Sequence, residues 1–122
     1  MTFTVMVFAN RKQGITHDTF KTRYEQHMLM ISDLCGDAAP LSHTRFYPKH
    51  DRLTDKPNLL ASDADVTFYS VVVVMGFKNE EAWQRFCAVL GTESASKKVL
   101  DDEAGFWDRE GMKVVVVERC GN

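Results

Sequence analysis

The feature that most constrains the fold is a pair of predicted strands that are apolar on both faces. Successive side chains of a strand point to opposite faces of a sheet. In the segment Val66–Phe77 one alternating set contains Val66, Phe68, Val72 and Val74, and the other contains Tyr69, Val71, Val73, Met75 and Phe77. The final strand, Met112–Arg119, repeats this with Val114 and Val116 on one side and Val115 and Val117 on the other. A sheet built around such strands must be covered on both faces.

The rest of the chain predicts two further strands and two or three helices. Thr16 is a suitable N-cap, and Phe20, Tyr24, His27, Met28, Ile31 and Leu34 recur at helical spacing until Gly36 ends the helix. Asn79 caps a second helix. The expected elements are strands 3–9, 41–47, 66–77 and 112–119, helices 16–36 and 80–90, a weaker helical segment 94–106, and a polar loop 49–65. This order is βαββαβ with an extra helical segment. It predicts one α+β, ferredoxin-like domain over residues 1–122.

Two helices can cover only one face of the predicted sheet. The other face would leave an exposed apolar patch larger than soluble monomers usually tolerate. A second copy of the sheet, related by two-fold symmetry, would cover it, so we expect a homodimer whose facing sheets form an α/β barrel. The barrel interior would then be a natural small-molecule cavity. The alternative is that the extra helix and the long loop cap the second face within one chain.

Composition excludes several classes of protein. The net charge is −2, with acidic and basic residues interleaved, so neither nucleic acid nor a membrane surface is an expected partner. The N-terminus lacks the pattern of a signal peptide, and the longest apolar run, Val71–Met75, is too short to span a bilayer. Three cysteines without a Cys-x-x-Cys pair favour neither disulfides nor zinc, and the reducing cytoplasm is the expected location. No spacing of acidic residues and histidines indicates a metal site.

Three segments carry a resemblance to a known family. Arg11-Lys12-Gln13-Gly14-Ile15-Thr16 is followed by Phe20 and then by Tyr24-Glu25-Gln26-His27. Near the other end stands Asp102-Glu103-Ala104-Gly105-Phe106-Trp107-Asp108, and Arg45-Phe46-Tyr47-Pro48-Lys49-His50 is a looser match. In this order they resemble the EthD family. Its members have an Arg-Lys-x-Gly turn before a helix with an aromatic residue and a histidine, and an Asp-Glu-x-x-Phe-x-Asp stretch before the last strand.

The resemblance implies a ferredoxin-like homodimer without a metal or an organic cofactor. It also implies chemistry on polyketide-like substrates of secondary metabolism: decarboxylation, cyclisation, dehydration or isomerisation. Two departures from the family are visible. The proline that often follows the helix histidine is absent from His27-Met28-Leu29-Met30, and an acidic residue common in the third strand is replaced at Val74. The second departure predicts a more apolar pocket.

Histidines are the first candidates for proton transfer, because imidazole titrates near neutrality. His27 is favoured by the resemblance, and a partly buried structural histidine is its alternative role. His43, Arg45 and Tyr47 alternate along one strand, so they form either a donor-rich wall for a carboxylate or enolate or an ordinary polar face. His50 stands where the long loop begins. We expect His17, in the first turn of its helix, to be exposed to solvent.

Aromatic and acidic residues supply the remaining candidates. The aromatic residues that could stack on a flat substrate are Phe8, Tyr24, Phe46, Tyr69, Phe106 and Trp107, with core packing as the alternative for each. Asp102, Glu103 and Asp108 could include a catalytic carboxylate, but a helix-capping or solvent-exposed role is favoured for each.

These residues support one leading hypothesis and two rivals. The leading hypothesis is a cofactor-free lyase, isomerase or cyclase that acts on an aromatic or enolisable small molecule, with His27 as general acid and base. The catalytic candidates are His27, His43, Tyr47 and His50. The substrate-binding candidates are Phe8, Tyr24, Arg45, Phe46, Tyr69, Phe106 and Trp107. The rivals are a cofactorless oxygenase that forms a quinone and a non-catalytic dimer that binds a small molecule.

Overall fold

A computed structural model of the chain describes residues 2–62 and 68–121. Its elements are β1 (Phe3–Arg11), α1 (His17–Cys35), the short 3-10 helix η1 (Gly36–Ala38), β2 (Ser42–Phe46), β3 (Val71–Phe77), α2 (Glu80–Leu90), α3 (Glu93–Glu103) and β4 (Trp107–Val117). The four strands form one antiparallel sheet in the order β2-β3-β1-β4. This confirms the α+β, ferredoxin-like arrangement.

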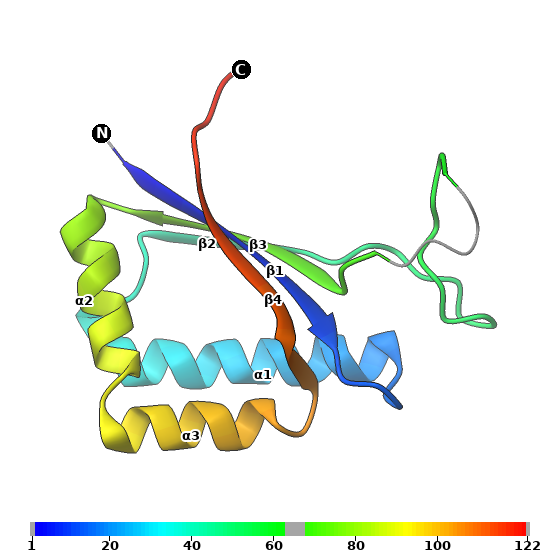
Figure 1. The fold of residues 1–122 in the computed structure, drawn as a ribbon, viewed down its shortest axis with the longest axis horizontal. Helices are drawn as coiled ribbons and strands as arrows, with labels where there is room; N and C mark the ends of the chain where they lie inside the picture. Colours follow the sequence, from blue (N-terminus) through cyan, green and yellow to red (C-terminus); the bar gives the residue numbers. More distant parts are fainter. Residues whose placement is uncertain (1, 63–67, 122) are drawn as a thin grey trace.

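The three helices lie on one side of the sheet, with α1 and α3 side by side beneath it and α2 at one end (Figure 1). Alternate residues of β1 and β3 point toward these helices and form the core with Phe20 and Tyr24 of α1. The buried strand residues are Val5, Val7, Ala9, Val71, Val73, Met75 and Phe77. The strict alternation of burial in both strands is the two-residue period expected of a sheet with one covered face.

The helix ends follow the local sequence signals. The Thr16 hydroxyl accepts a hydrogen bond from the Thr19 N–H, which satisfies one of the free donors at the start of α1. Gly36 ends α1 with a φ of 53°, a conformation that costs glycine little. The Asn79 side chain caps α2 by accepting from the Ala82 N–H at 2.9 Å. These three predicted positions are confirmed.

Two strands begin five residues away from their predicted starts, and the other strand ends differ by no more than two residues. The third strand begins at Val71 rather than Val66; residues 68–70 are not in a strand, and residues 66–67 lie outside the described residues. The Ser70 hydroxyl accepts the Arg11 N–H at 2.9 Å, so a side chain replaces the backbone pairing at that point. The last strand begins at Trp107 rather than at Met112, because β1 continues to Arg11 and pairs with Trp107 past an irregularity between Phe8 and Asn10.

The sheet face opposite the helices, called the open face below, remains accessible in the single chain. Its apolar side chains include Met6, Phe8, Phe46, Val72, Val74, Val115 and Val117. Phe46 is 56% exposed and Val115 is 45% exposed. Helix α3 packs against α1 and α2, on the side that is already covered. The alternative in which this helix caps the second face is therefore wrong.

Candidate functional site

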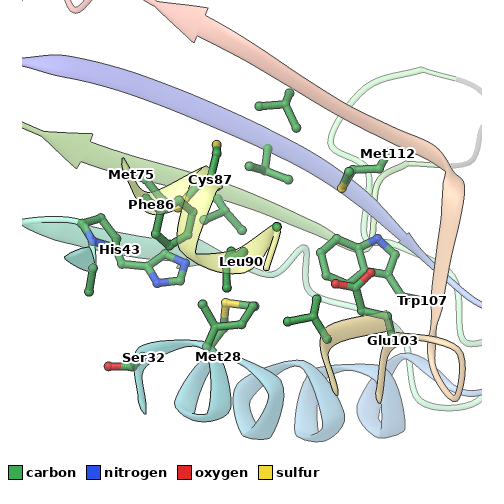
Figure 2. A pocket seen from close by; sticks show the side chains of 18 of the residues that line it. Met28, Ser32, His43, Met75, Phe86, Cys87, Leu90, Glu103, Trp107 and Met112 are labelled. Atoms are coloured by element: carbon green, nitrogen blue, oxygen red, sulfur yellow. The ribbon is translucent and has the colours of Figure 1, made fainter. Parts of the chain in front are cut away.

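A pocket of about 460 Å³ lies between the sheet and the three helices of the single chain. Most of its wall is aliphatic, aromatic or sulfur-containing, with Met28 from α1, Phe86, Cys87 and Leu90 from α2, and Met75 and Met112 from the sheet (Figure 2). A largely apolar cavity with a few polar groups is typical of small-molecule sites. This cavity differs from the expected one, which was to lie between the facing sheets of two chains.

Glu103, the last residue of α3, brings a carboxylate to the pocket wall beside Trp107 (Figure 2). Its side chain is only 4% exposed. One carboxylate oxygen is paired with the Arg109 guanidinium, which also lines the pocket. The other lies 3.1 Å from His27 Nε2. A buried charge is stable only when it is paired and hydrogen-bonded, and Arg109 and His27 are the partners of Glu103. The prediction that Glu103 has a capping or solvent-exposed role is wrong.

His27 is completely buried on α1 and lies between two neighbouring carboxylates of α3. Its Nδ1 is 2.7 Å from Asp102 Oδ2, and its Nε2 faces Glu103 as described above. Phe106 and Trp107 pack their rings against the imidazole at right angles or close to it. Because both ring nitrogens already have partners, a substrate in the pocket meets Glu103 rather than His27. His27 thus contacts the pocket carboxylate but does not itself line the pocket.

The polar row on β2 faces the helices, not the open face. Arg45 makes a bidentate pair with Glu25 of α1, at 2.6 Å from Nε and 2.8 Å from the second guanidinium nitrogen. The Tyr47 hydroxyl donates to the same carboxylate. Hydrogen bonds from Arg45 hold the pKa of Glu25 below its usual range. Arg45 and Tyr47 thus tie β2 to α1, and His43 alone of this row lines the pocket.

His50 lies away from the pocket, stacked on His17 at the start of α1. Their ring centroids are 3.5 Å apart and the rings are nearly parallel. His50 Nδ1 is 2.8 Å from the Pro48 carbonyl oxygen. His17 is 5% exposed, so the prediction that it is solvated is wrong. Burial, then the neighbouring His50 and Arg11 charges, lower the pKa of His17 to about 4.

The loop that begins at Lys49 is attached to the same region by Asp55. The Asp55 carboxylate pairs with Arg11 and accepts the His17 N–H at 3.2 Å. No residue of the described part of this loop, 49–62, lines the pocket. Residues 63–65 lie outside the described residues.

The predicted aromatic residues divide into three groups. Tyr24 and Trp107 line the pocket, and burial raises the pKa of Tyr24, so its hydroxyl stays protonated and able to donate a hydrogen bond. Phe106 is completely buried behind them, against Phe20 and His27. Phe8, Phe46 and Tyr69 do not line this pocket. Phe8 and Phe46 lie on the open face, and Tyr69 packs against Phe8 with a centroid distance of 5.0 Å.

Val74 also lies on the open face, so its replacement of an acidic residue does not make this pocket more apolar. The three cysteines are all free thiols: Cys35 is buried, whereas Cys87 and Cys120 are exposed. Cys87 is the one of the three that lines the pocket.

Two observations concern other kinds of site. Among residues 2–62 and 68–121, no group of three or more His, Cys, Asp or Glu side chains is arranged to hold a metal ion. In the same part of the chain, no helix has both the length and the apolar character needed to cross a membrane.

Arg109 was not among the residues that the sequence suggested for the site. Asp102 and Glu103 were considered as catalytic carboxylates, but a capping or solvent-exposed role was favoured for each. The signal that could have reversed this preference was the Asp-Glu pair itself. Adjacent residues at the end of a helix point in different directions, so they can reach two sides of one buried ring. The pairing of Arg109 depends on where β4 begins, and that boundary was predicted wrongly.

Comparisons with known proteins agree with this fold. The EthD domain model matches residues 12–110. No curated protein matches significantly. An EthD-like protein from Ralstonia eutropha JMP134 has a TM-score of 0.60 at 17% identity, with 97% of this chain and 95% of that chain covered. A dimeric protein of unknown function and ferredoxin-like fold from Bacteroides fragilis NCTC 9343 also has a TM-score of 0.60, at 7% identity over 97% and 96%. SnoaB, a cofactor-independent oxygenase from Streptomyces nogalater, has a TM-score of 0.50 at 9% identity over 99% and 93%.

Proposed function

Since the chain belongs to the EthD domain family, we propose that it is an enzyme that transfers protons on an aromatic or enolisable small molecule, without a cofactor, in the pocket between sheet and helices. The observation that carries this proposal is the Glu103 carboxylate, which is held at fixed geometry in the wall of a mainly apolar cavity. The reaction classes are decarboxylation, cyclisation, dehydration and isomerisation of a polyketide-like substrate.

Glu103 is the general acid and base of the proposed reaction. Its carboxylate takes a proton from a carbon next to a carbonyl group, and the electron pair moves to the carbonyl oxygen as an enolate. Arg109 and the Tyr24 hydroxyl lie in the same pocket, and both can donate hydrogen bonds to the developing negative charge. The protonated Glu103 then returns the proton to another atom of the substrate. This assignment replaces His27 as the group that contacts the substrate.

The test is an anaerobic incubation with aromatic polyketide carboxylic acids and polyketones, followed by mass spectrometry. We expect loss of carbon dioxide or water, or a product of unchanged mass and altered retention. Glu103→Gln should lower the rate by about 100- to 10,000-fold, the usual contribution of one proton-transfer group. Glu93→Gln is the matched control, because Glu93 is exposed in the first turn of the same helix. Full activity in the Glu103 variant would rule out this mechanism.

A cofactor-independent oxygenase is the second candidate. It is favoured by the structural similarity to SnoaB, which carries that description. Carbanions and phenolates formed by proton removal can react directly with oxygen, so the same carboxylate would serve. Product formation only after air is admitted, with matching oxygen consumption, would establish this candidate. Stoichiometric ligand binding without conversion under either condition would instead indicate a non-catalytic binding protein.

The proposed enzyme is a homodimer built on the open face. Its support is the exposed apolar surface around Phe46 and Val115, and the dimeric description of a solved structure with the same fold. Sedimentation should give twice the mass of one chain. Val115→Glu should shift the mass toward the monomer. Val116→Glu changes a valine on the other side of β4 that is even more exposed, at 60%, and should have less effect. A monomeric wild-type protein would contradict this part of the proposal.

A further inference from the structure

The geometry points to a proton relay in which Asp102 and His27 connect the pocket carboxylate of Glu103 to solvent. This inference rests on the proposed function, because it concerns the proton that Glu103 exchanges with the substrate. It assigns His27 and Asp102 as positioning and relay residues. Neither of them contacts the pocket.

The three side chains form a continuous hydrogen-bonded path from the surface to the cavity. Asp102 Oδ2 is 2.7 Å from His27 Nδ1, and His27 Nε2 is 3.1 Å from Glu103 Oε2. The side chains are 34%, 0% and 4% exposed, respectively. Only Asp102 meets bulk water directly. A proton that leaves the buried pair on this side must pass through it.

The hydrogen-bonded path requires a hydrogen on each ring nitrogen of His27. An ionised carboxylate can only accept hydrogen bonds, so both contacts of His27 form together when both of its ring nitrogens carry hydrogen. The ring then has a positive charge between two negative ones. Arg109 pairs with the other oxygen of Glu103, and Arg23 lies 3.7 Å from the other oxygen of Asp102. Tyr24, whose pKa is raised by burial and in part by the Glu103 charge, also faces this cluster.

The relay solves an electrostatic problem of the proposed chemistry. When Glu103 accepts the substrate proton, the total charge of the pocket is unchanged, but the His27–Glu103 pair goes from neutral to +1 while the substrate becomes an enolate of charge −1. Separating these charges in a region of low dielectric is costly. In the relay, the Glu103 oxygen beside Arg109 takes the substrate proton, and His27 releases its Nδ1 proton to Asp102. Asp102 passes that proton to water. The buried His27–Glu103 pair keeps its total charge, and return of the substrate proton reverses each transfer.

A relay and a simple structural clamp predict opposite effects for Asp102→Asn. The amide keeps the shape of the side chain and can accept a hydrogen bond, but it does not take up and release a proton. If Asp102 carries protons, its loss slows the exchange of the His27 ring hydrogens with water. If Asp102 only holds the ring in place, its loss loosens the ring and speeds that exchange.

The experiment is nuclear magnetic resonance of the full chain labelled with nitrogen-15 at histidine, without any substrate. In the wild type, both ring nitrogens of His27 should show the chemical shifts of N–H groups. In Asp102→Asn, exchange of the Nδ1 hydrogen with water should slow by roughly 100-fold, the lower end of what a positioned proton-transfer group contributes. Asp101→Asn is the matched control, because it removes the same charge from the neighbouring exposed residue, and its exchange should equal the wild type.

Unchanged or faster exchange in Asp102→Asn would overturn the relay, as would a His27 nitrogen without hydrogen in the wild type. These outcomes are separate from the test of the proposed function. Loss of turnover in Glu103→Gln together with unaffected exchange in Asp102→Asn would keep the function and remove the relay. Full turnover in Glu103→Gln would remove the proposed function, whatever the exchange rates show.

Discussion

Helix α1 buries two histidines, His17 in its first turn and His27 near its middle, and it gives them opposite surroundings. His27 has a carboxylate oxygen beside each ring nitrogen. His17 is stacked on His50, lies near Arg11, and has a buried Nδ1 without a hydrogen-bond partner among the described residues. The two side chains are almost equally inaccessible, at 0% and 5% exposed.

The comparison shows that the partners of a buried histidine, more than its depth, decide what it contributes. Burial without a compensating charge disfavours the imidazolium, and at His17 the neighbouring cations add to this effect. At His27 each ring nitrogen instead has a carboxylate oxygen as its partner. His17 is thus suited to packing as a neutral ring, whereas His27 is suited to linking two acids through its two ring nitrogens.

The comparison predicts its largest difference for the same substitution at the two positions. His27→Gln removes the ring that contacts the buried Glu103 carboxylate, and removing one partner of a buried charge costs about 3–5 kcal/mol. His17→Gln loses mainly the ring stack with His50, which is worth about 1 kcal/mol. Urea unfolding at pH 7 measures both free energies. Equal losses of unfolding free energy in the two variants would show that burial, rather than the contacts of the ring nitrogens, determines how much a histidine contributes to stability.

The second prediction concerns pH. The pKa of His17 is about 4 in the folded chain and close to 6.5 when unfolded, so the unfolded chain binds more protons between these values. Stability from this group is complete above pH 6.5 and falls as the pH drops toward 4. The loss amounts to about 2 kcal/mol at pH 5. His17→Gln should remove this part of the pH dependence, as measured by unfolding at pH 7 and pH 5. If stability falls equally between pH 7 and pH 5 in the variant and the wild type, a group other than His17 causes the pH dependence.

Asp102→Asn tests the surroundings of His27 with a smaller change. It weakens one charge-assisted hydrogen bond at a partly exposed carboxylate, so we expect a loss of about 1–1.5 kcal/mol in the free energy of unfolding. Asp101→Asn removes a surface charge paired with Lys97 and should change stability by no more than about 0.5 kcal/mol. Thermal unfolding of the two variants side by side is sufficient. A larger loss of stability in Asp101→Asn than in Asp102→Asn would contradict the expectation that the contact with the buried His27 ring stabilises the fold.

The smallest expected effect is at Asp55, which holds the loop beside His17. Asp55→Asn keeps a residue that tolerates the φ of 57° found there, and it weakens the pairing with Arg11. The free energy of unfolding should fall by about 0.5–1 kcal/mol. Asp37→Asn, at a more exposed pair with Arg85, should be nearly neutral and serves as the control. Equal effects of the two substitutions would mean that the attachment of the loop adds no stability.

Much of the fold followed from periodicity and capping. Thr16, Gly36 and Asn79 mark helix ends through hydrogen bonds made within a few residues, so a local pattern is enough to place them. The starts of β3 and β4 depend on contacts distant in sequence. The Ser70 hydroxyl meets the Arg11 N–H, and Arg11 pairs with Trp107 past an irregularity. No local pattern contains that information.

The candidate site was predictable in part. The resemblance directed attention to His27, and the structure places it beside the pocket. Its partners are more than seventy residues away in sequence, and nothing in the periodicity of 94–106 shows that Glu103 points inward. The location of the cavity was also predicted wrongly. The apolar pattern of the strands shows that the open face needs a cover, but it does not show how the helices pack on the other face.

The reactivity of the Cys87 thiol, which lies in the pocket wall, can show whether a molecule occupies the cavity. Burial raises the pKa of this thiol, so its alkylation is slow at neutral pH and accelerates as the pH rises. Cys35 is buried and Cys120 lies beyond the last strand, so the three thiols should differ in how bound molecules protect them. A compound that fills the pocket should shield Cys87 and leave Cys120 reactive. Alkylation followed by peptide mass spectrometry would therefore screen a chemical library for occupants of the cavity before any reaction is known.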